Sequence, residues 1–215
     1  ATTGSDANPG TQALPFKTIQ KAADTVVAGD TVYVLPGTYA PVLSTKSGTA
    51  TAPIRFISQQ KWSAKIVVTN GALYGWQNNG SYVNIEGFDV SGSVHAGIIF
   101  YGSYNKAIGN HVHDIGKTDC SREANSGING GPSTAVGNDA IGNLIHDLMF
   151  NCPVVSGWQH PHGIYFGYNG GIIANNIVYR AQGFGIHLYH APKNTKVVNN
   201  IAFNNGASGI IVGGT

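Results

Sequence analysis

Short stretches in which apolar and polar residues alternate recur through the second half of the chain. One such phrase joins Gly to Ile and is found as AGIIF, SGING, HGIYF, FGIHL and SGIIV. A second phrase is centred on Asn and is found as AIGNHVHD, AIGNLIHD, IANNIVYR and VVNNIAFN. Short segments with a two-residue period and many β-branched side chains are typical of strands and are too short for helices. The pattern therefore predicts two sets of repeated strands.

The two phrases alternate, and only the connections between them change in length. Successive copies of the Gly-Ile phrase are 30, 36, 22 and 24 residues apart, and successive Asn phrases are 33, 33 and 24 residues apart. Periods of roughly 20–50 residues indicate a solenoid. Coils of this length with two or three short strands predict an all-β parallel β-helix whose coils stack about 4.8 Å apart. We expect a single domain over residues 1–215.

Residues at equivalent positions of successive coils should stack in ladders. Asn tolerates the left-handed backbone of a tight corner, and its side chain can bond its counterpart in the next coil. One corner is therefore predicted to contain Asn110, Asn143, Asn176 and Asn200. Inward ladders are predicted for Ile98, Ile128, Ile164, Ile186 and Ile210, and for Val112, Ile145, Val178 and Ala202.

The two ends of the predicted solenoid differ. The segment LPFKTIQKAADTVVAG predicts a helix near residues 16–27, with Pro15 at its start and an apolar face, within an N-terminal cap of about residues 1–30. A solenoid needs such a cap because its core is open at each end. The other end stops at GIIVGGT within a coil, so the surface beyond Ile210 and Val212 is expected to be covered by another subunit or by further residues.

Composition narrows the class of protein. Hydrophobic residues make up 42% and charged residues 10% of the chain, and its 30 Gly residues suit many tight turns. A net charge of +2 without a basic run argues against nucleic acid as a partner, and no apolar stretch is long enough to span a membrane. The opening ATTGSDANPG suits a mature N-terminus left by cleavage behind a small residue.

The N-terminal third resembles a known group of proteins. GSDANPGTQALPFKTIQKAADTVVAGDTVYVLPGTYAP, followed by SGTATAPIRFIS, resembles the opening of right-handed parallel β-helix proteins of the pectate-lyase superfamily, most closely exopolygalacturonate-lyase-like chains. The resemblance implies secretion to an extracellular or periplasmic location. It also implies a polysaccharide ligand and a groove along the first strand of each coil. It makes calcium a possible cofactor, but the sequence has no aspartate-rich loop of the kind that holds calcium.

The layout of that superfamily places the Gly-Ile strands along the groove. The outward column would then read Ile99, Asn129, Tyr165, His187 and Ile211, with a polar centre between apolar ends. This favours a polysaccharide lyase that acts by β-elimination on a uronic-acid polymer, with these catalytic candidates: His187 or His162 as base, Tyr165 as acid, and Arg180 or Asn129 as charge partner. The predicted substrate-binding residues are Asn129, Trp158 and Lys193. The alternative is a non-catalytic structural or adhesive β-helix that binds glycans or stacks end to end.

A second column follows the Asn corner and contains His113, His146, Tyr179 and Phe203. Stacked His113 and His146 could ligate a transition metal, with His111 or an Asp as third ligand, or could form a plain hydrogen-bonded stack. Asp114 and Asp147 follow the two histidines, and a carboxyl pair of this kind is also compatible with a glycosidase.

Two coils are longer than the others just before the Gly-Ile strand. The additional segments are DIGKTDCSREAN and DLMFNCPVVSGWQHPH, which place Cys120 and Cys152 in matching loops of successive coils. A disulfide between them is geometrically plausible and would suit a secreted protein, and the alternative is two free thiols.

Overall fold

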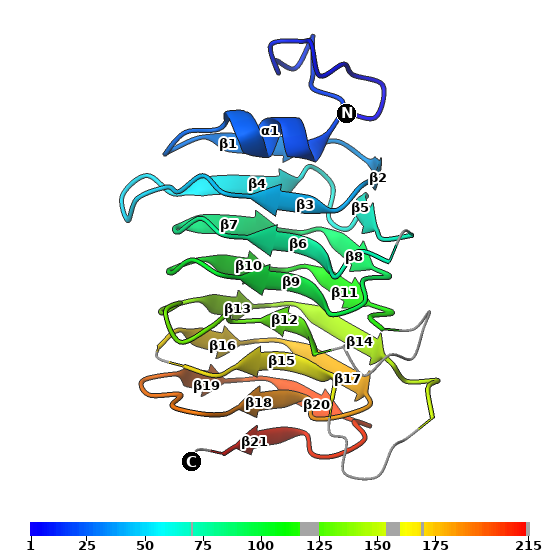
Figure 1. Ribbon diagram of the computed structural model, residues 1–215, viewed down its shortest axis with the longest axis vertical. Coiled ribbons are helices and arrows are strands. Elements are labelled where there is room, and N and C mark those ends of the chain that lie inside the picture. The colour runs from blue at the N-terminus through cyan, green and yellow to red at the C-terminus, as the bar shows by residue number, and fades with distance from the viewer. Residues whose placement is uncertain (70, 117–124, 154–159, 169, 214–215) are drawn as a thin grey trace.

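The structure is a computed structural model of the chain, and it describes residues 1–69, 71–116, 125–153, 160–168 and 170–213. Its strands form three parallel sheets of seven strands each, stacked coil upon coil (Figure 1). The predicted right-handed parallel β-helix is confirmed. Strands lie in the same order in every full coil, one in each of the sheets that we call A, B and C.

Sheet A contains β1 (Thr31–Val34), β4 (Ile54–Ser58), β7 (Val83–Glu86), β10 (Lys106–Ile108), β13 (Asp139–Ile141), β16 (Ile172–Ala174) and β19 (Lys196–Val198). Sheet B contains β2 (Gly37–Tyr39), β5 (Ala64–Val67), β8 (Asp89–Ser91), β11 (His111–His113), β14 (Leu144–Leu148), β17 (Ile177–Ala181) and β20 (Ile201–Phe203). Sheet C contains β3 (Val42–Ser44), β6 (Tyr74–Asn78), β9 (Ala96–Phe100), β12 (Ser126–Asn129), β15 (His162–Phe166), β18 (Ile186–Leu188) and β21 (Ile210–Val212).

The Asn corner joins sheet A to sheet B, as predicted. The side-chain oxygen of Asn143 accepts hydrogen bonds from the backbone N–H and side-chain amide of Asn110, at 2.9 and 3.2 Å. Asn143 donates in the same way to Asn176, and Asn176 donates to Asn200. The residue before each ladder Asn has a left-handed backbone, with these φ values: Gly109 62°, Gly142 65°, Asn175 59° and Asn199 53°. Only residues that tolerate positive φ fit there, which explains the alternation of Gly and Asn at this position.

The two inward ladders are also confirmed. Strand pairing aligns Ile98, Ile128, Ile164, Ile186 and Ile210 in sheet C. It aligns Val112, Ile145, Val178 and Ala202 in sheet B. Ile98 to Ile186 in the first ladder are fully buried, whereas Ile210 is 44% exposed. The prediction that Ile210 and Val212 are covered by another subunit or by further residues remains a prediction.

The N-terminal cap contains α1 (Ile19–Thr25), whose buried residues Ile19, Ala22 and Ala23 face the first coil. This helix is shorter than the predicted span of residues 16–27. Its start is delayed by Asp6, whose carboxylate accepts the backbone N–H groups of Lys17 and Thr18, both at 2.9 Å. Thr18 then caps the helix by accepting the backbone N–H of Lys21. No helix in the described ranges is long and apolar enough to cross a membrane.

Candidate functional site

Strand pairing aligns two rows of residues in sheet C that bear on the site. The first is the predicted row Ile99, Asn129, Tyr165, His187 and Ile211. The second is the buried row Ala96, Ser126 and His162. In each strand of this row, a Gly lies two residues before the outward side chain, either as the second residue of the strand or immediately before the strand. A Cβ on Gly163 would lie 2.1 Å from Cγ1 of Val178 and 2.5 Å from the carbonyl oxygen of Gly185, so no larger side chain fits. The Gly-Ile phrase is therefore a packing requirement that positions the outward residues.

His162 and His187 meet on this face. Nδ1 of His187 lies 3.1 Å from Nε2 of His162, and the two rings are T-shaped with centroids 4.5 Å apart. Tyr165 and Phe184 both stack on the His162 ring, each with a centroid distance of 5.4 Å. His162 is fully buried, while His187 is partly exposed. We call His162, Tyr165, Phe184 and His187 the aromatic cluster.

Both histidines of the aromatic cluster are held in the neutral state. Burial, together with the charges of His160 and His187, lowers the pKa of His162 to about 2. Burial, together with the charges of His160 and His190, lowers the pKa of His187 to about 4. Burial also raises the pKa of Tyr165, which keeps its hydroxyl protonated. The cluster thus offers a neutral imidazole that can accept a proton and a phenol that can donate one.

The direction of the hydrogen bond between the histidines decides which nitrogen of His187 has a free lone pair. When Nε2 of His162 accepts the proton on Nδ1 of His187, Nε2 of His187 is left with an unshared lone pair. That atom has no hydrogen bond to a described residue, whereas Nδ1 of His162 is buried without a partner in the described part of the chain. His162 can therefore orient His187, and its own burial keeps it away from solvent.

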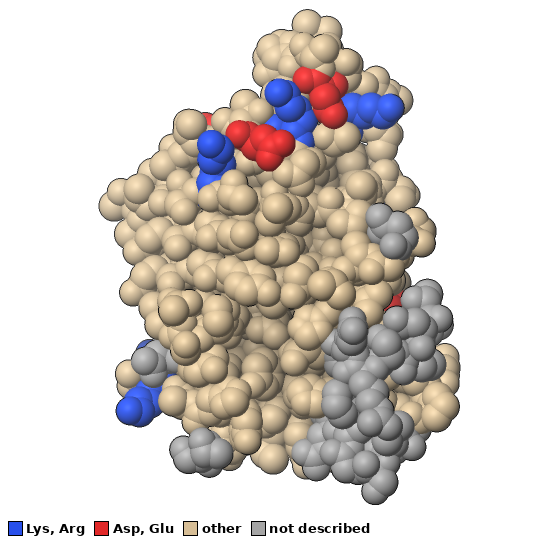
Figure 2. Space-filling view, in the orientation of Figure 1, with Lys and Arg blue, Asp and Glu red and all other residues tan. Residues whose placement is uncertain are grey.

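The other residues expected around His187 have different positions. Asn129 is 7% exposed, and its amide donates to Asn125 while its oxygen accepts the backbone N–H of Gly131, both at 2.8 Å. Lys193 is exposed in the segment between β18 and β19. Trp158 lies outside the described residues. Figure 2, which faces sheet C, shows charged side chains mainly at the end that carries α1 and few on the rest of this face.

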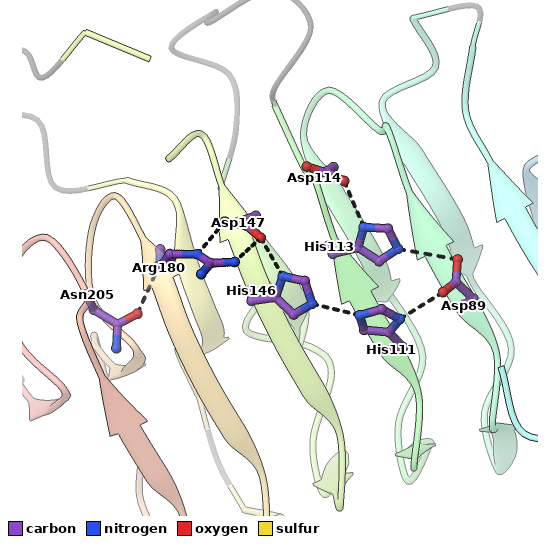
Figure 3. A network of polar contacts seen from close by, with 9 residues as sticks. Asp89, His111, His113, Asp114, His146, Asp147, Arg180 and Asn205 are labelled. Atoms are coloured by element: carbon purple, nitrogen blue, oxygen red, sulfur yellow. Dashed lines mark hydrogen bonds and ion pairs between the residues drawn. The ribbon is translucent and has the colours of Figure 1, made fainter. Parts of the chain in front are cut away.

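Arg180 corrects the prediction that it borders His187. It lies in sheet B, and its guanidinium donates two hydrogen bonds to Asp147, at 2.6 Å from Nε and 2.5 Å from Nη2 (Figure 3). Arg180 and His187 are close in the sequence, but a corner of the coil separates their sheets. Arg180 is thus an ion-pair partner in sheet B.

A second cluster of polar side chains lies on sheet B (Figure 3). We call it the histidine–aspartate cluster, and its members are Asp89, His111, His113, Asp114, His146 and Asp147. Pairing confirms that His113, His146, Tyr179 and Phe203 form one column. His111 lies beside this column, with Nδ1 2.8 Å from Oδ2 of Asp89 and Nε2 2.7 Å from Nε2 of His146. His113 and His146 use Nδ1 to contact Asp114 and Asp147, at 2.8 and 2.7 Å.

Asp89 is the member of this cluster that the sequence analysis missed. It aligns with His111 in the strand pairing, 22 residues before it. The phrase IEGFDV contains it and corresponds to AIGNHV of the next coil. The Asn pattern does not include this phrase because Phe88 replaces the ladder Asn, although the backbone N–H of Phe88 is still bonded to the side chain of Asn110. The spacing of the apolar residues is the signal that identifies it.

Neighbouring side chains lower the pKa values of two carboxyl groups in this cluster. Burial alone would raise the pKa of Asp89, but hydrogen bonds and charge from His111 and His113 hold that pKa well below its usual range. The Arg180 guanidinium has the largest part in lowering the pKa of Asp147. Asp114 and Asp147, considered above as a glycosidase pair, are thus each paired with a histidine at the end of a sheet B strand.

Comparison with known proteins gives the relatives of this chain. The model of a family described as "Pel9A-like, right handed beta helix region" matches residues 1–144. Pectate lyase PEL9 of Emericella nidulans is 49% identical over 53 residues, which are 23% of this chain and 13% of that protein. The crystal structure of pectate lyase Pel9A matches with a TM-score of 0.76 and 20% identity, over 95% of this chain and 52% of that one.

A rhamnogalacturonan lyase structure matches with a TM-score of 0.72 and 23% identity, over 100% of this chain and 61% of that one. The chain therefore spans between half and two thirds of these two lyase structures, and a much smaller part of the curated relative. At such identities the structural likeness establishes the fold alone.

Proposed function

The chain belongs to the Pel9A-like right-handed β-helix family, and on that premise we propose that it cleaves an acidic, uronic-acid polysaccharide by β-elimination on the face of sheet C. It is a polysaccharide-lyase-like β-helix. The single observation that supports catalysis is the contact between His187 and the buried His162, at 3.1 Å, beside Tyr165. Secretion and a polysaccharide partner are part of the same proposal.

The proposed reaction needs one base and one acid. Nε2 of His187 removes the proton α to the uronate carboxylate, the electron pair forms a carbon–carbon double bond, and the bond to the leaving glycosidic oxygen breaks. Tyr165 donates its phenolic proton to that oxygen. His162 is a positioning residue in this scheme, because its complete burial keeps it from touching a substrate. Trp158 and Lys193 remain proposed substrate contacts.

Calcium does not fit the residues described on this face. Calcium takes six to eight oxygen ligands, several of them carboxylates. No Asp or Glu lies in any strand of sheet C, and the oxygen of Asn129 is already used by the backbone of Gly131. We therefore derive no step through calcium, and a neutral base such as His187 is consistent with this difference from a calcium-dependent lyase.

A non-catalytic glycan-binding β-helix is the second candidate. It is favoured by the location of Arg180, whose ion pair with Asp147 removes the expected cationic partner from the side of His187. The two candidates make different predictions for one experiment. The purified chain is incubated with pectate, rhamnogalacturonan and alginate, with calcium and with a chelator. Unsaturated product is followed by ultraviolet absorbance, and binding is measured in parallel.

Formation of unsaturated ends on one polymer supports the lyase, and the chelator should leave the rate unchanged. Binding without product on any polymer supports the glycan-binding alternative. Neither product nor binding on the acidic polymers would contradict both assignments for this chain.

The disulfide remains a prediction, since Cys120 lies outside the described residues. Cys152 is buried four residues after the end of β14. A bond between Cys120 and Cys152 should stabilise the chain by about 3–4 kcal/mol through loop closure in the unfolded state. Denaturation without reductant, followed by alkylation and mass spectrometry, should find both thiols blocked. Two alkylated thiols in the unreduced protein would show that the bond is not formed.

A further inference from the structure

The histidine–aspartate cluster brings three metal-ligating side chains together on two adjacent strands. Asp89 begins β8, and His111 and His113 both belong to β11. One ligand atom from each lies within 4.8 Å of the other two. The side chains are 13%, 19% and 20% exposed, so an ion can reach them from solvent. We propose that Asp89, His111 and His113 form a site for a divalent transition-metal ion of the zinc class, separate from sheet C.

The first argument is the direction in which the ring nitrogens of the cluster point. Nδ1 of His113 and Nδ1 of His146 contact Asp114 and Asp147, at 2.8 and 2.7 Å. Nε2 of His111 contacts Nε2 of His146 at 2.7 Å. One nitrogen each of His111 and His113 is therefore not used by these contacts.

The remaining ring nitrogens of His111 and His113 both face Asp89. Nδ1 of His111 lies 2.8 Å from Oδ2, and Nε2 of His113 lies 3.4 Å from Oδ1. The rings of His111 and His113 stack with centroids 4.3 Å apart, which keeps the two nitrogens close together. Two nitrogen ligands and one carboxylate therefore converge on one place.

The second argument is the support around the proposed ligands. Histidine ligands usually donate their other ring N–H to a carboxylate or another acceptor, which fixes the tautomer and the ring orientation. His113 has Asp114 in this role, and His111 has His146, which is held in turn by Asp147. Arg180 fixes Asp147 with two hydrogen bonds. The chain of contacts in Figure 3 thus holds both ligand nitrogens toward Asp89.

Two imidazoles and one carboxylate indicate the kind of metal. This donor set suits zinc and related divalent ions, which bind nitrogen and oxygen ligands at about 2.0–2.2 Å and often leave one position open for water. Calcium and magnesium prefer oxygen ligands alone. The proposal does not depend on the proposed lyase activity, since the cluster lies on a different sheet.

The test is titration of the chelator-treated protein with zinc chloride at neutral pH by isothermal calorimetry. Wild type should bind one zinc ion per chain at this site. His113→Ala and Asp89→Ala should each weaken binding more than about 100-fold, and Asp114→Asn should weaken it about 10–100-fold. His187→Ala is the matched control, because it removes a histidine of the aromatic cluster and should leave zinc affinity at the wild-type value.

A second readout is local to the site. The Trp62 ring lies 5.0 Å from the His111 ring, so cobalt(II) bound there should quench the fluorescence of Trp62. Trp62→Phe should lose the quenchable component while still binding the ion. Circular dichroism checks that each variant is folded, and His113→Gln replaces any His113→Ala protein that is not. No zinc binding by wild type, or binding that Asp89→Ala and the His113 variants leave unchanged, would overturn the proposal.

Discussion

Replacing His187 with Ala is expected to lower kcat/KM on the cleaved polysaccharide by about 10²–10⁴-fold, the usual contribution of a general base. His187 is the one histidine of the aromatic cluster that is both partly exposed and oriented by a neighbour, through its 3.1 Å contact with His162. The fold should survive the change, because the inward neighbours Ile186 and Leu188 are untouched. Initial rates and thermal unfolding of the same preparations provide the measurement.

His190→Asn is the matched control for this prediction. His190 is exposed near the same cluster, and its φ of 61° is one that Asn tolerates. The control should retain wild-type activity to within a few fold. A His187→Ala protein with wild-type activity would remove this residue from the mechanism, and bound sugar along sheet B would move the site to another face.

The pH dependence of kcat/KM should reflect the lowered pKa of His187. A base must be unprotonated, and burial and the charges of His160 and His190 bring the pKa of His187 to about 4. The rate should therefore stay level as pH falls through 6.5, where an ordinary histidine protonates, and should decline only as pH approaches about 4. Initial rates between about pH 3.5 and 8 test this.

Acid unfolding is separated from this effect by returning samples to neutral pH. Because the folded-state pKa of His187 lies below the unfolded value, folding disfavours its protonation, and stability decreases as pH falls from 6.5 toward 4. Samples held at each pH and then assayed at pH 7 should recover full activity. A decline centred near 6.5 in samples that recover would contradict the assigned base.

The sequence was sufficient to predict which residues stack, because the spacing of strands in a solenoid is repeated in the chain itself. Ile98 to Ile210 and Asn110 to Asn200 could be aligned without knowledge of any long-range contact. The outward row with Asn129, Tyr165 and His187 followed from the same register.

Contacts that cross between registers could not be predicted in this way. The bond between His162 and His187 joins residues of two different rows of sheet C, and its geometry depends on ring rotamers. Arg180 was misplaced because proximity in sequence does not show at which corner the chain turns. The helix start depended on Asp6, which reaches Thr18 from a segment with no periodicity at all.

The largest loss of stability from a single change in the Asn corner is expected at its centre. Asn143 is 1% exposed, its oxygen accepts the backbone N–H of Asn110, and its amide donates to the carbonyl oxygen of Ala107 at 3.0 Å. Asn143→Ala leaves that N–H and that carbonyl buried without these partners. At about 1–3 kcal/mol for each of the two unsatisfied groups, the free energy of unfolding should fall by about 2–6 kcal/mol.

Two further variants decide whether the corner itself is responsible. Asn200→Ala lies at the end of the ladder, where Asn200 is only partly buried and solvent can replace its lost bonds, so it should cost less than Asn143→Ala. Asn84→Ala changes a partly exposed residue of β7 outside the ladder and should alter stability by no more than about 0.5 kcal/mol. Denaturant unfolding of the three proteins ranks them. Equal denaturant midpoints for Asn143→Ala and Asn84→Ala would show that the stacked amides position the corner without stabilising it. In that case water would satisfy the groups that the side chain of Asn143 had bonded.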